Sequence, residues 1–276
     1  MSLQKPYPWQ SRPAVMGIIN LSHDSFYQPA LSQDDLLFQA DAMVAAGVDI
    51  IDVGAEATNP NVTVCERTDA SIQQELECVA AAVHSLKMRF DGLISVDTSQ
   101  PKVMSEVIAE GADMINDQRA LSLPGALAVL QTSDVPVCLM HGLRHARSAS
   151  TSSNAALLAQ VIEDLQSDVD RCSAAGILPA RCILDPGFGF GKSLQHNFVL
   201  LENLEQMIGL SYPVLAGMSR KSMIGQLLNA PVNERLAGSI ACATIAALKG
   251  AHIIRVHDVK ESVQAVRVVT AMQYGA

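Results

Sequence analysis

The chain has 276 residues, 49% of them hydrophobic, and a formal net charge of −9 at pH 7. The length suits one α/β barrel of about 250 residues or two smaller domains, and the apolar content excludes wholesale disorder. The acidic balance argues against a nucleic-acid partner, and no apolar run approaches the roughly 20 residues that a membrane-spanning helix needs.

The first thirteen residues form a predicted N-terminal extension (1–13) that contains Trp9 and three prolines. This segment lacks the apolar centre of a signal peptide. Six cysteines are scattered along the chain, and no pair of them has the spacing of zinc ligands. We therefore expect reduced cysteines that serve packing, in a cytoplasmic protein.

Eight short apolar runs follow, and most of them are apolar on both faces, which is typical of parallel strands buried between layers. The predicted strands cover residues 15–20, 50–54, 93–97, 114–116, 135–140, 182–185, 214–217 and 253–256. Helical patterns separate them, and Gly47 is expected to end the first. The predicted helices cover residues 32–46, 69–89, 101–110, 123–131, 154–175, 196–207, 233–249 and 259–272.

Strand and helix alternate eight times, which predicts an α/β protein built as a single (β/α)8 TIM barrel over residues 1–276. A doubly wound open sheet is the alternative. It is disfavoured because the usual Gly-rich turn after its first strand is missing here.

Carboxylate and amide side chains end three of the predicted strands, where barrels of this type build their active sites. They are Asp97, Asn116 and Asp185, with the apolar Met140 and Phe190 close by in the sequence. Such groups match the paired donors and acceptors of a flat amino-pyrimidinone ring. The alternative for each one is to cap a helix or strand end, but three at separate strand ends favour a ligand pocket.

Cations follow the last two predicted strands. Arg220 and Lys221 come after the seventh, and Arg255 and His257 end the eighth. Because Arg255 and His257 are two positions apart, their side chains point to one side of the strand. We expect this region to bind an anion such as phosphate; the alternative for His257 is a core or helix-capping role.

The Gly-rich run from Asp185 to Lys192 resembles a phosphate cradle but lacks the spacing of a Walker loop. Its glycines, Gly187, Gly189 and Gly191, are expected to take positive φ and let the backbone approach a ligand. His141 ends the fifth strand without a second ligand at metal-binding spacing. A metal, where needed, is therefore expected to arrive with a phosphorylated substrate as Mg²⁺.

At these residues the chain resembles the dihydropteroate synthase family of the folate pathway, over almost its whole length. The shared motifs are Met16-Gly-Ile-Ile-Asn20, Ile51-Asp-Val-Gly54, Ile94-Ser-Val-Asp-Thr-Ser99, Ile115-Asn-Asp117, Leu184-Asp-Pro-Gly-Phe-Gly-Phe-Gly-Lys192, Gly217-Met-Ser-Arg-Lys-Ser222 and Ile254-Arg-Val-His-Asp258. The resemblance implies a barrel, a homodimer and a transferase that forms a C–N bond. That reaction joins 6-hydroxymethyl-7,8-dihydropterin pyrophosphate to p-aminobenzoate and releases pyrophosphate.

The resemblance also implies roles for individual residues. Arg255 would stack on the pterin and, with His257 and Asn20, hold the pyrophosphate and its Mg²⁺, for which Asn20 is the expected protein ligand. The implied catalytic residues are Asn20, Thr58, Lys221, Arg255 and His257. The implied substrate-binding residues are Asp97, Asn116, Met140, Asp185, Phe190, Gly217, Lys221, Ser222 and Arg255.

Two loops depart from the family pattern. Family members usually carry an acid in the first loop and an arginine in the second, and here amides replace them, as Gln28 and Asn59. We expect an active enzyme with altered loop behaviour. The alternative is a pterin-binding paralogue that has lost turnover. A methyltransferase acting on a reduced folate is a third hypothesis, disfavoured by the anion-binding residues because that reaction releases no pyrophosphate.

Overall fold

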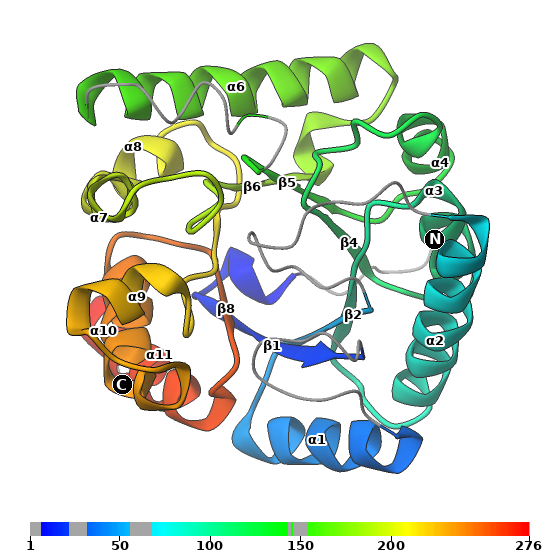
Figure 1. Cartoon of the computed structure of the whole chain (residues 1–276), viewed down its shortest axis with the longest axis horizontal. Coiled ribbons are helices and arrows are strands. Elements are labelled where there is room, and N and C mark those ends of the chain that lie inside the picture. The colour runs from blue at the N-terminus through cyan, green and yellow to red at the C-terminus, as the bar shows by residue number, and fades with distance from the viewer. Residues whose placement is uncertain (1–6, 22–31, 56–67, 143–144, 146–153, 276) are drawn as a thin grey trace.

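Eight parallel strands form the centre of the molecule and helices surround them, which confirms the predicted TIM barrel (Figure 1). The structure is a computed structural model that describes residues 7–21, 32–55, 68–142, 145 and 154–275, apart from the side chains of residues 155 and 274. The strands are β1 (Ala14–Asn20), β2 (Ile50–Gly54), β3 (Leu93–Asp97), β4 (Met114–Asp117), β5 (Val137–Met140), β6 (Cys182–Asp185), β7 (Leu215–Ala216) and β8 (Ile253–Val256).

The strands follow one another around the ring in the order β6-β5-β4-β3-β2-β1-β8-β7. A single parallel bridge between Leu184 and Val214 joins β6 to β7 and brings the two ends of the sheet together. All eight strands therefore point their carboxyl ends to the same face, which is the face seen in Figure 1.

The helices of the described residues form the outer layer. They are α1 (Gln33–Ala46), α2 (Asp69–Lys87), α3 (Pro101–Ala109), α4 (Ala126–Gln131), α6 (Asn154–Ala174), α7 (Leu194–Glu202), α8 (Leu204–Ile208), α9 (Ser222–Leu228), α10 (Leu236–Leu248) and α11 (Val259–Tyr274). Helix α1 begins at a capping box between Ser32 and Asp35 and ends at Gly47, whose φ of 91° confirms the predicted stop.

The helical predictions differ from the structure in several places. Helix α9 was not among the predicted helices, because its seven residues are too few to show an apolar repeat before Asn229 ends it in the left-handed region, at φ 49°. The predicted helix 196–207 begins earlier and is divided into α7 and α8 at Asn203. The predicted helix 233–249 begins only at Leu236, after the short 3-10 helix η4 (Val232–Glu234).

Side-chain alternation along the strands separates an apolar floor from a polar pocket. The floor is a cluster of inward-facing residues that includes Ile50, Met114, Cys138, Ile183, Leu215 and Ile253. Because side chains two positions apart face the same side, the next inward residue on each of these strands lies one layer nearer the carboxyl face. Those residues are Asp52, Asn116, Met140, Asp185, Gly217 and Arg255.

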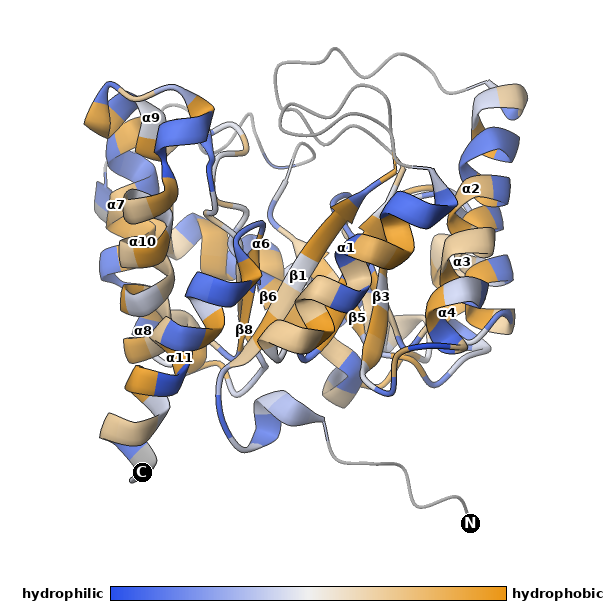
Figure 2. Cartoon of the chain, turned by 90° about the horizontal axis from the view of Figure 1, so that it is seen from below, coloured by the Kyte–Doolittle hydropathy of each residue, from blue (hydrophilic) through white to orange (hydrophobic). Residues whose placement is uncertain are grey.

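The N-terminal segment closes the floor of the barrel. Its short helix η1 (Pro8–Gln10) lies beneath the strands, at the end opposite α9 (Figure 2). Trp9 is 5% exposed and packs into the floor cluster, and the ring of Tyr7 stacks on it with 4.5 Å between ring centroids. The described part of the predicted extension is therefore packed against the barrel.

Candidate active site

A cavity of about 250 Å³ lies at the carboxyl end of the strands. This volume is close to the lower end of the range for small-molecule sites, about 300–1,000 Å³. The predicted site residues that the structure describes all line it: Asn20, Asp97, Asn116, Met140, Asp185, Phe190, Gly217, Lys221, Ser222, Arg255 and His257. Thr58, Gln28 and Asn59 lie outside the described residues.

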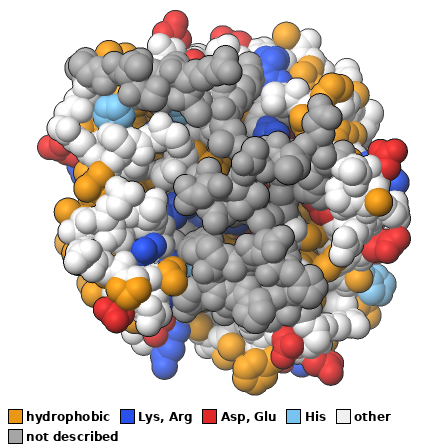
Figure 3. All heavy atoms as spheres, in the orientation of Figure 1, with side chains coloured by type: hydrophobic (Ala, Val, Ile, Leu, Met, Phe, Trp, Pro, Cys, Tyr) orange, Lys and Arg blue, Asp and Glu red, His pale blue; other side chains and the backbone are white. Residues whose placement is uncertain are grey.

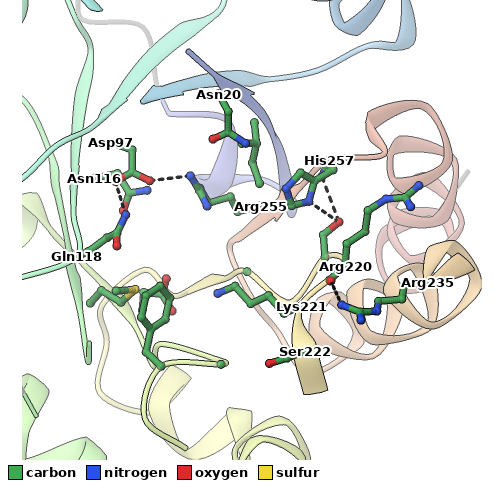
Figure 4. Close-up of a pocket in the computed structure, with 17 residues that line it drawn as sticks. Asn20, Asp97, Asn116, Gln118, Arg220, Lys221, Ser222, Arg235, Arg255 and His257 are labelled. Atoms are coloured by element: carbon green, nitrogen blue, oxygen red, sulfur yellow. Dashed lines mark hydrogen bonds and ion pairs between the residues drawn. The ribbon is translucent and has the colours of Figure 1, made fainter. Parts of the chain in front are cut away.

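Arg255 crosses the inner part of the cavity and pairs with two buried carboxylates. Its Nη2 donates to Asp97 Oδ2 at 2.8 Å (Figure 4). Its Nε donates to Asp52 Oδ2 at 2.7 Å. Burial acts to lower the pKa of Arg255, but Asp52 and Asp97 outweigh it and the net direction is upward. Asn116 joins this group through its Nδ2, which lies 3.3 Å from Asp52 Oδ2.

Asp185 and Lys221 form the second charged group of the cavity. Burial raises the pKa of Asp185, while Lys221 and the backbone N–H of Gly187 favour its charged form. Lys221 Nζ donates to the carbonyl of Phe188 at 2.7 Å and lies 4.7 Å from the centroid of the Phe190 ring. Burial lowers the pKa of Lys221 to about 8.

The Gly-rich run after β6 folds around Lys192 rather than around an anion. Gly187, Gly189 and Gly191 take φ values of 68°, 84° and 64°, which confirms the predicted positive φ. Lys192 Nζ donates to the carbonyls of His141, Gly187 and Phe190 at 3.0, 2.9 and 3.2 Å. An ammonium group has three donors, so these contacts use all of them. Burial lowers the pKa of Lys192 to about 7.

The predicted cation set after β7 and β8 is only partly what the structure shows. Arg220 pairs with Asp258 at 2.6 and 2.9 Å, and its side chain points away from the cavity centre (Figure 4). Burial, Arg255 and Arg220 lower the pKa of His257 to about 3, so the ring is neutral. Its Nδ1 lies 3.1 Å from the Ser219 hydroxyl. Besides Arg220, the cations that line the cavity are Lys221, Arg235 and Arg255, and Lys and Arg side chains show near the centre of this face (Figure 3).

Three residues of the site were not singled out from the sequence. Asp52 and Gln118 each lie two positions beyond an inward-facing residue, so side-chain alternation would have found them. Arg235 had no such signal, because it precedes α10 and reaches back to donate to the carbonyl of Arg220 at 2.9 Å. Gly225 leaves room for it, since a Cβ there would overlap the Arg235 guanidinium.

His141 serves the scaffold beside the cavity. Its Nε2 lies 3.0 Å from Asp164 Oδ2, and its ring stacks on His145 with centroids 4.6 Å apart. Burial, Lys192 and His145 lower its pKa to about 3 against the opposing effect of Asp164. Within the described residues, His, Cys, Asp and Glu side chains form no group of three that would hold a metal ion.

Comparisons with known proteins show which family the chain is similar to. The model of a family described as pterin binding enzymes matches residues 16–257. The dihydropteroate synthase of Escherichia coli (strain K12) is 47% identical over 264 residues, which cover 95% of this chain and 92% of the relative. In the part of the chain that the structure describes, no helix has the length and apolar character to cross a membrane.

Two solved structures are similar over the whole barrel. The Coxiella burnetii dihydropteroate synthase in complex with pteroic acid has a TM-score of 0.90 and 46% identity, and the match covers 96% of this chain and 95% of that one. The Yersinia pestis dihydropteroate synthase in complex with a sulfonamide drug has a TM-score of 0.89 and 44% identity, with 95% of each chain covered.

Proposed function

The chain belongs to the dihydropteroate synthase family of pterin-binding enzymes, and on this premise we propose how its cavity performs the family reaction. The reaction forms a C–N bond between 6-hydroxymethyl-7,8-dihydropterin pyrophosphate and p-aminobenzoate, and gives 7,8-dihydropteroate and pyrophosphate. The observation that carries the proposal is that buried acceptors and cations from separate strands share one cavity. A flat ring with a diphosphate needs both kinds of group.

The inner part of the cavity suits the pterin ring. Asp97 and Asp185 accept hydrogen bonds, Lys221 donates them, and Asn116 does both, so the set matches a ring edge that alternates donors and acceptors. Met140 and Phe190 provide apolar contact with the ring faces. Gly217 keeps the cavity open because it has no side chain. Arg255, held by Asp52, is placed to cover the ring and reach the diphosphate.

The outer part of the cavity suits the leaving group and the amine. The C–O bond breaks first, and its electron pair leaves with the diphosphate while positive charge develops on the methylene carbon. Arg255 stabilises the departing charge, and the neutral His257 contributes hydrogen bonding rather than charge. The amino group of p-aminobenzoate is already a neutral nucleophile, so it attacks the carbon, forms the C–N bond and then loses a proton. Ser222 and Arg235 line the cavity, and we assign them to its carboxylate; Thr58 is assigned to the diphosphate side.

The residues present fit a Mg²⁺ ion that enters with the diphosphate. Mg²⁺ prefers oxygen ligands and usually keeps several waters, with one or two protein oxygens and the substrate phosphates completing its shell. Asn20 brings an amide oxygen to the cavity wall on the side of Arg255 and His257 (Figure 4). Bound there, the ion would neutralise charge on the diphosphate.

We also propose that the protein is a cytoplasmic homodimer. Helix α10 carries no charged residue and leaves Ile245 and Leu248 exposed, and the neighbouring α11 exposes Val268 at 70% and Met272 at 67%. A helix that is apolar all round is normally buried, so a second copy is the expected cover. The described cysteines are free, which suits a reducing compartment.

Pyrophosphate release tests the function. The chain, given the pterin pyrophosphate, p-aminobenzoate and Mg²⁺, should release pyrophosphate, and omission of p-aminobenzoate or addition of a chelator should suppress the release. Asp185→Asn should act as an inactive control of the same size. Tight calorimetric binding of the pterin pyrophosphate without release would instead support the paralogue, and restored release in Gln28→Asp combined with Asn59→Arg would locate the defect in the two loops.

A further inference from the structure

Gln118 is a polar residue of the cavity wall that the family motifs do not account for. It lies directly after β4, two positions beyond Asn116, so its side chain faces the same interior. Its Nε2 donates to Asp97 Oδ1 at 2.8 Å (Figure 4). The Gln118 side chain is only partly buried and lines the cavity. Its amide has an Oε1 acceptor and a second N–H donor in addition to the N–H that binds Asp97.

Asp97 is thus held from two sides by partners of different character. The guanidinium of Arg255 binds Oδ2, and the neutral amide of Gln118 binds Oδ1. Asp97 is 3% exposed, so the orientation of its carboxylate is decided by protein donors rather than by bulk water. Of the two donors, only Gln118 is uncharged and therefore has little attraction to a diphosphate.

Under the proposed function, Arg255 has to serve both the carboxylates and the leaving diphosphate. The diphosphate and Asp97 compete for the Nη2 donor, and an exchange of that contact requires the rigid guanidinium to tilt as a whole. During that exchange the Gln118 hydrogen bond still holds Oδ1, so the Asp97 carboxylate keeps its plane. A carboxylate fixed in this way meets the ring without reorganisation.

We propose that Gln118 is a positioning and specificity-determining residue for the pterin substrate. It fixes Asp97 toward the ring when Arg255 shifts its Nη2 to the diphosphate, and it adds its own amide oxygen and second N–H to recognition of the ring. The inference rests on the proposed function and assigns a role in binding rather than in the bond-making step. Substitution of Gln118 should therefore change the KM for the pterin substrate and not kcat.

Two substitutions test this role. Gln118→Leu keeps the approximate volume and removes the hydrogen bond, and it should raise the pterin KM and the calorimetric Kd by about tenfold, the usual effect of losing a hydrogen bond to a charged group. Gln118→Glu places a like charge beside Asp97 and should raise both values further. The KM for p-aminobenzoate should stay at the wild-type value, whereas the thermal midpoint should fall because the buried Asp97 carboxylate loses a donor. Gln195→Leu, an exposed glutamine on α7, is the matched control.

A double-mutant cycle separates positioning from a purely structural role. If Gln118 acts through Asp97, the effects of Gln118→Leu and Asp97→Asn on the Kd should be clearly less than additive. Additive effects, or a Gln118→Leu enzyme with wild-type Kd and KM, would overturn the inference. A wild-type chain that neither binds the pterin pyrophosphate nor releases pyrophosphate would instead overturn the proposed function, so the two failures are distinguishable.

Discussion

Five charged side chains meet inside the barrel, and their balance sets the chemistry of the cavity. Asp52, Asp97 and Asp185 face Arg255 and Lys221, all at positions where a charge has little contact with water. Removal of one partner from such a group leaves another charge uncompensated, which is costly in a buried site. The effect of a single substitution on activity or stability therefore includes the response of the whole charged group as well as the loss of the residue that is changed.

For single residues, side-chain alternation along the strands explains what the sequence could predict, and contacts between distant segments explain what it could not. Strand-end position and period two were enough to place Asp97, Asn116, Asp185 and Arg255 in one cavity. The neutral state of His257 and the pairing of Arg220 with Asp258 depend on contacts between segments 38 residues apart. No local pattern carries such information, so these features required the three-dimensional structure.

The buried lysines predict an alkaline loss of activity. Burial holds the pKa of Lys192 at about 7 and that of Lys221 at about 8, both below the ordinary value of 10.5. Both groups therefore lose a proton as the pH rises through this window, and each loses a hydrogen-bond donor of the cavity or its loop. We expect kcat/KM for the pterin substrate, which reports the free enzyme, to fall as the pH rises from 7 toward 9.

A substitution can show which lysine causes which part of the fall in kcat/KM with rising pH. Lys221→Arg places a cation that does not titrate in this range, so the limb near pH 8 should disappear while the limb from Lys192 remains. Steady-state rates in overlapping buffers of constant ionic strength measure it. A wild-type kcat/KM that stays constant from pH 7 to 9 would contradict the role of both lysines.

Among the elements, the loop between β6 and α7 shows how a Gly-rich segment becomes a rigid wall. The sequence predicted the positive φ of its glycines, because side chains rarely adopt that conformation. The inward direction of Lys192 was not predictable, because its three acceptors belong to backbone that only folding brings together. The same loop supplies the Phe190 ring and the Phe188 carbonyl to the cavity.

Lys192→Met should loosen this loop. It leaves three carbonyls without their donor, at a cost of about 1–3 kcal/mol for each one that stays unsatisfied. We expect a loss of at least about 2 kcal/mol in the free energy of unfolding by urea, together with a raised pterin KM because Phe190 is displaced. The exposed Lys260→Met on α11 is the control and should change neither value. Unchanged stability in Lys192→Met would show that the loop holds without the ammonium.

For the whole molecule, the alternation of strands and helices was readable from the sequence, but helix ends and the short α9 were not. The strands are marked by continuous apolar runs, whereas the predicted helical patterns run on through Asn203, where φ is −108°, and through the residues before Leu236. The proposed dimer surface was also not predictable from the sequence, because it depends on α10 and α11 lying side by side (Figure 1).

A charge on this surface should break the proposed dimer. Ile245→Glu or Val268→Glu would place an unpaired carboxylate in an apolar contact, which costs several kcal/mol and should give a monomer by sedimentation at micromolar concentration. Met88→Glu, at an exposed position just after α2, should leave the wild-type mass unchanged. A wild-type chain that sediments as a monomer would contradict the proposal directly.

The placement of Trp9 has a practical consequence for all of these experiments. It is the one tryptophan of the chain, and it sits at the pole of the barrel farthest from the ligand space. The emission spectrum of Trp9 should therefore report how the N-terminal segment packs against the floor of the barrel. It should change little when residues of the ligand cavity are substituted. The protein thus carries an intrinsic optical reporter that distinguishes a collapsed barrel from an intact barrel with an impaired pocket.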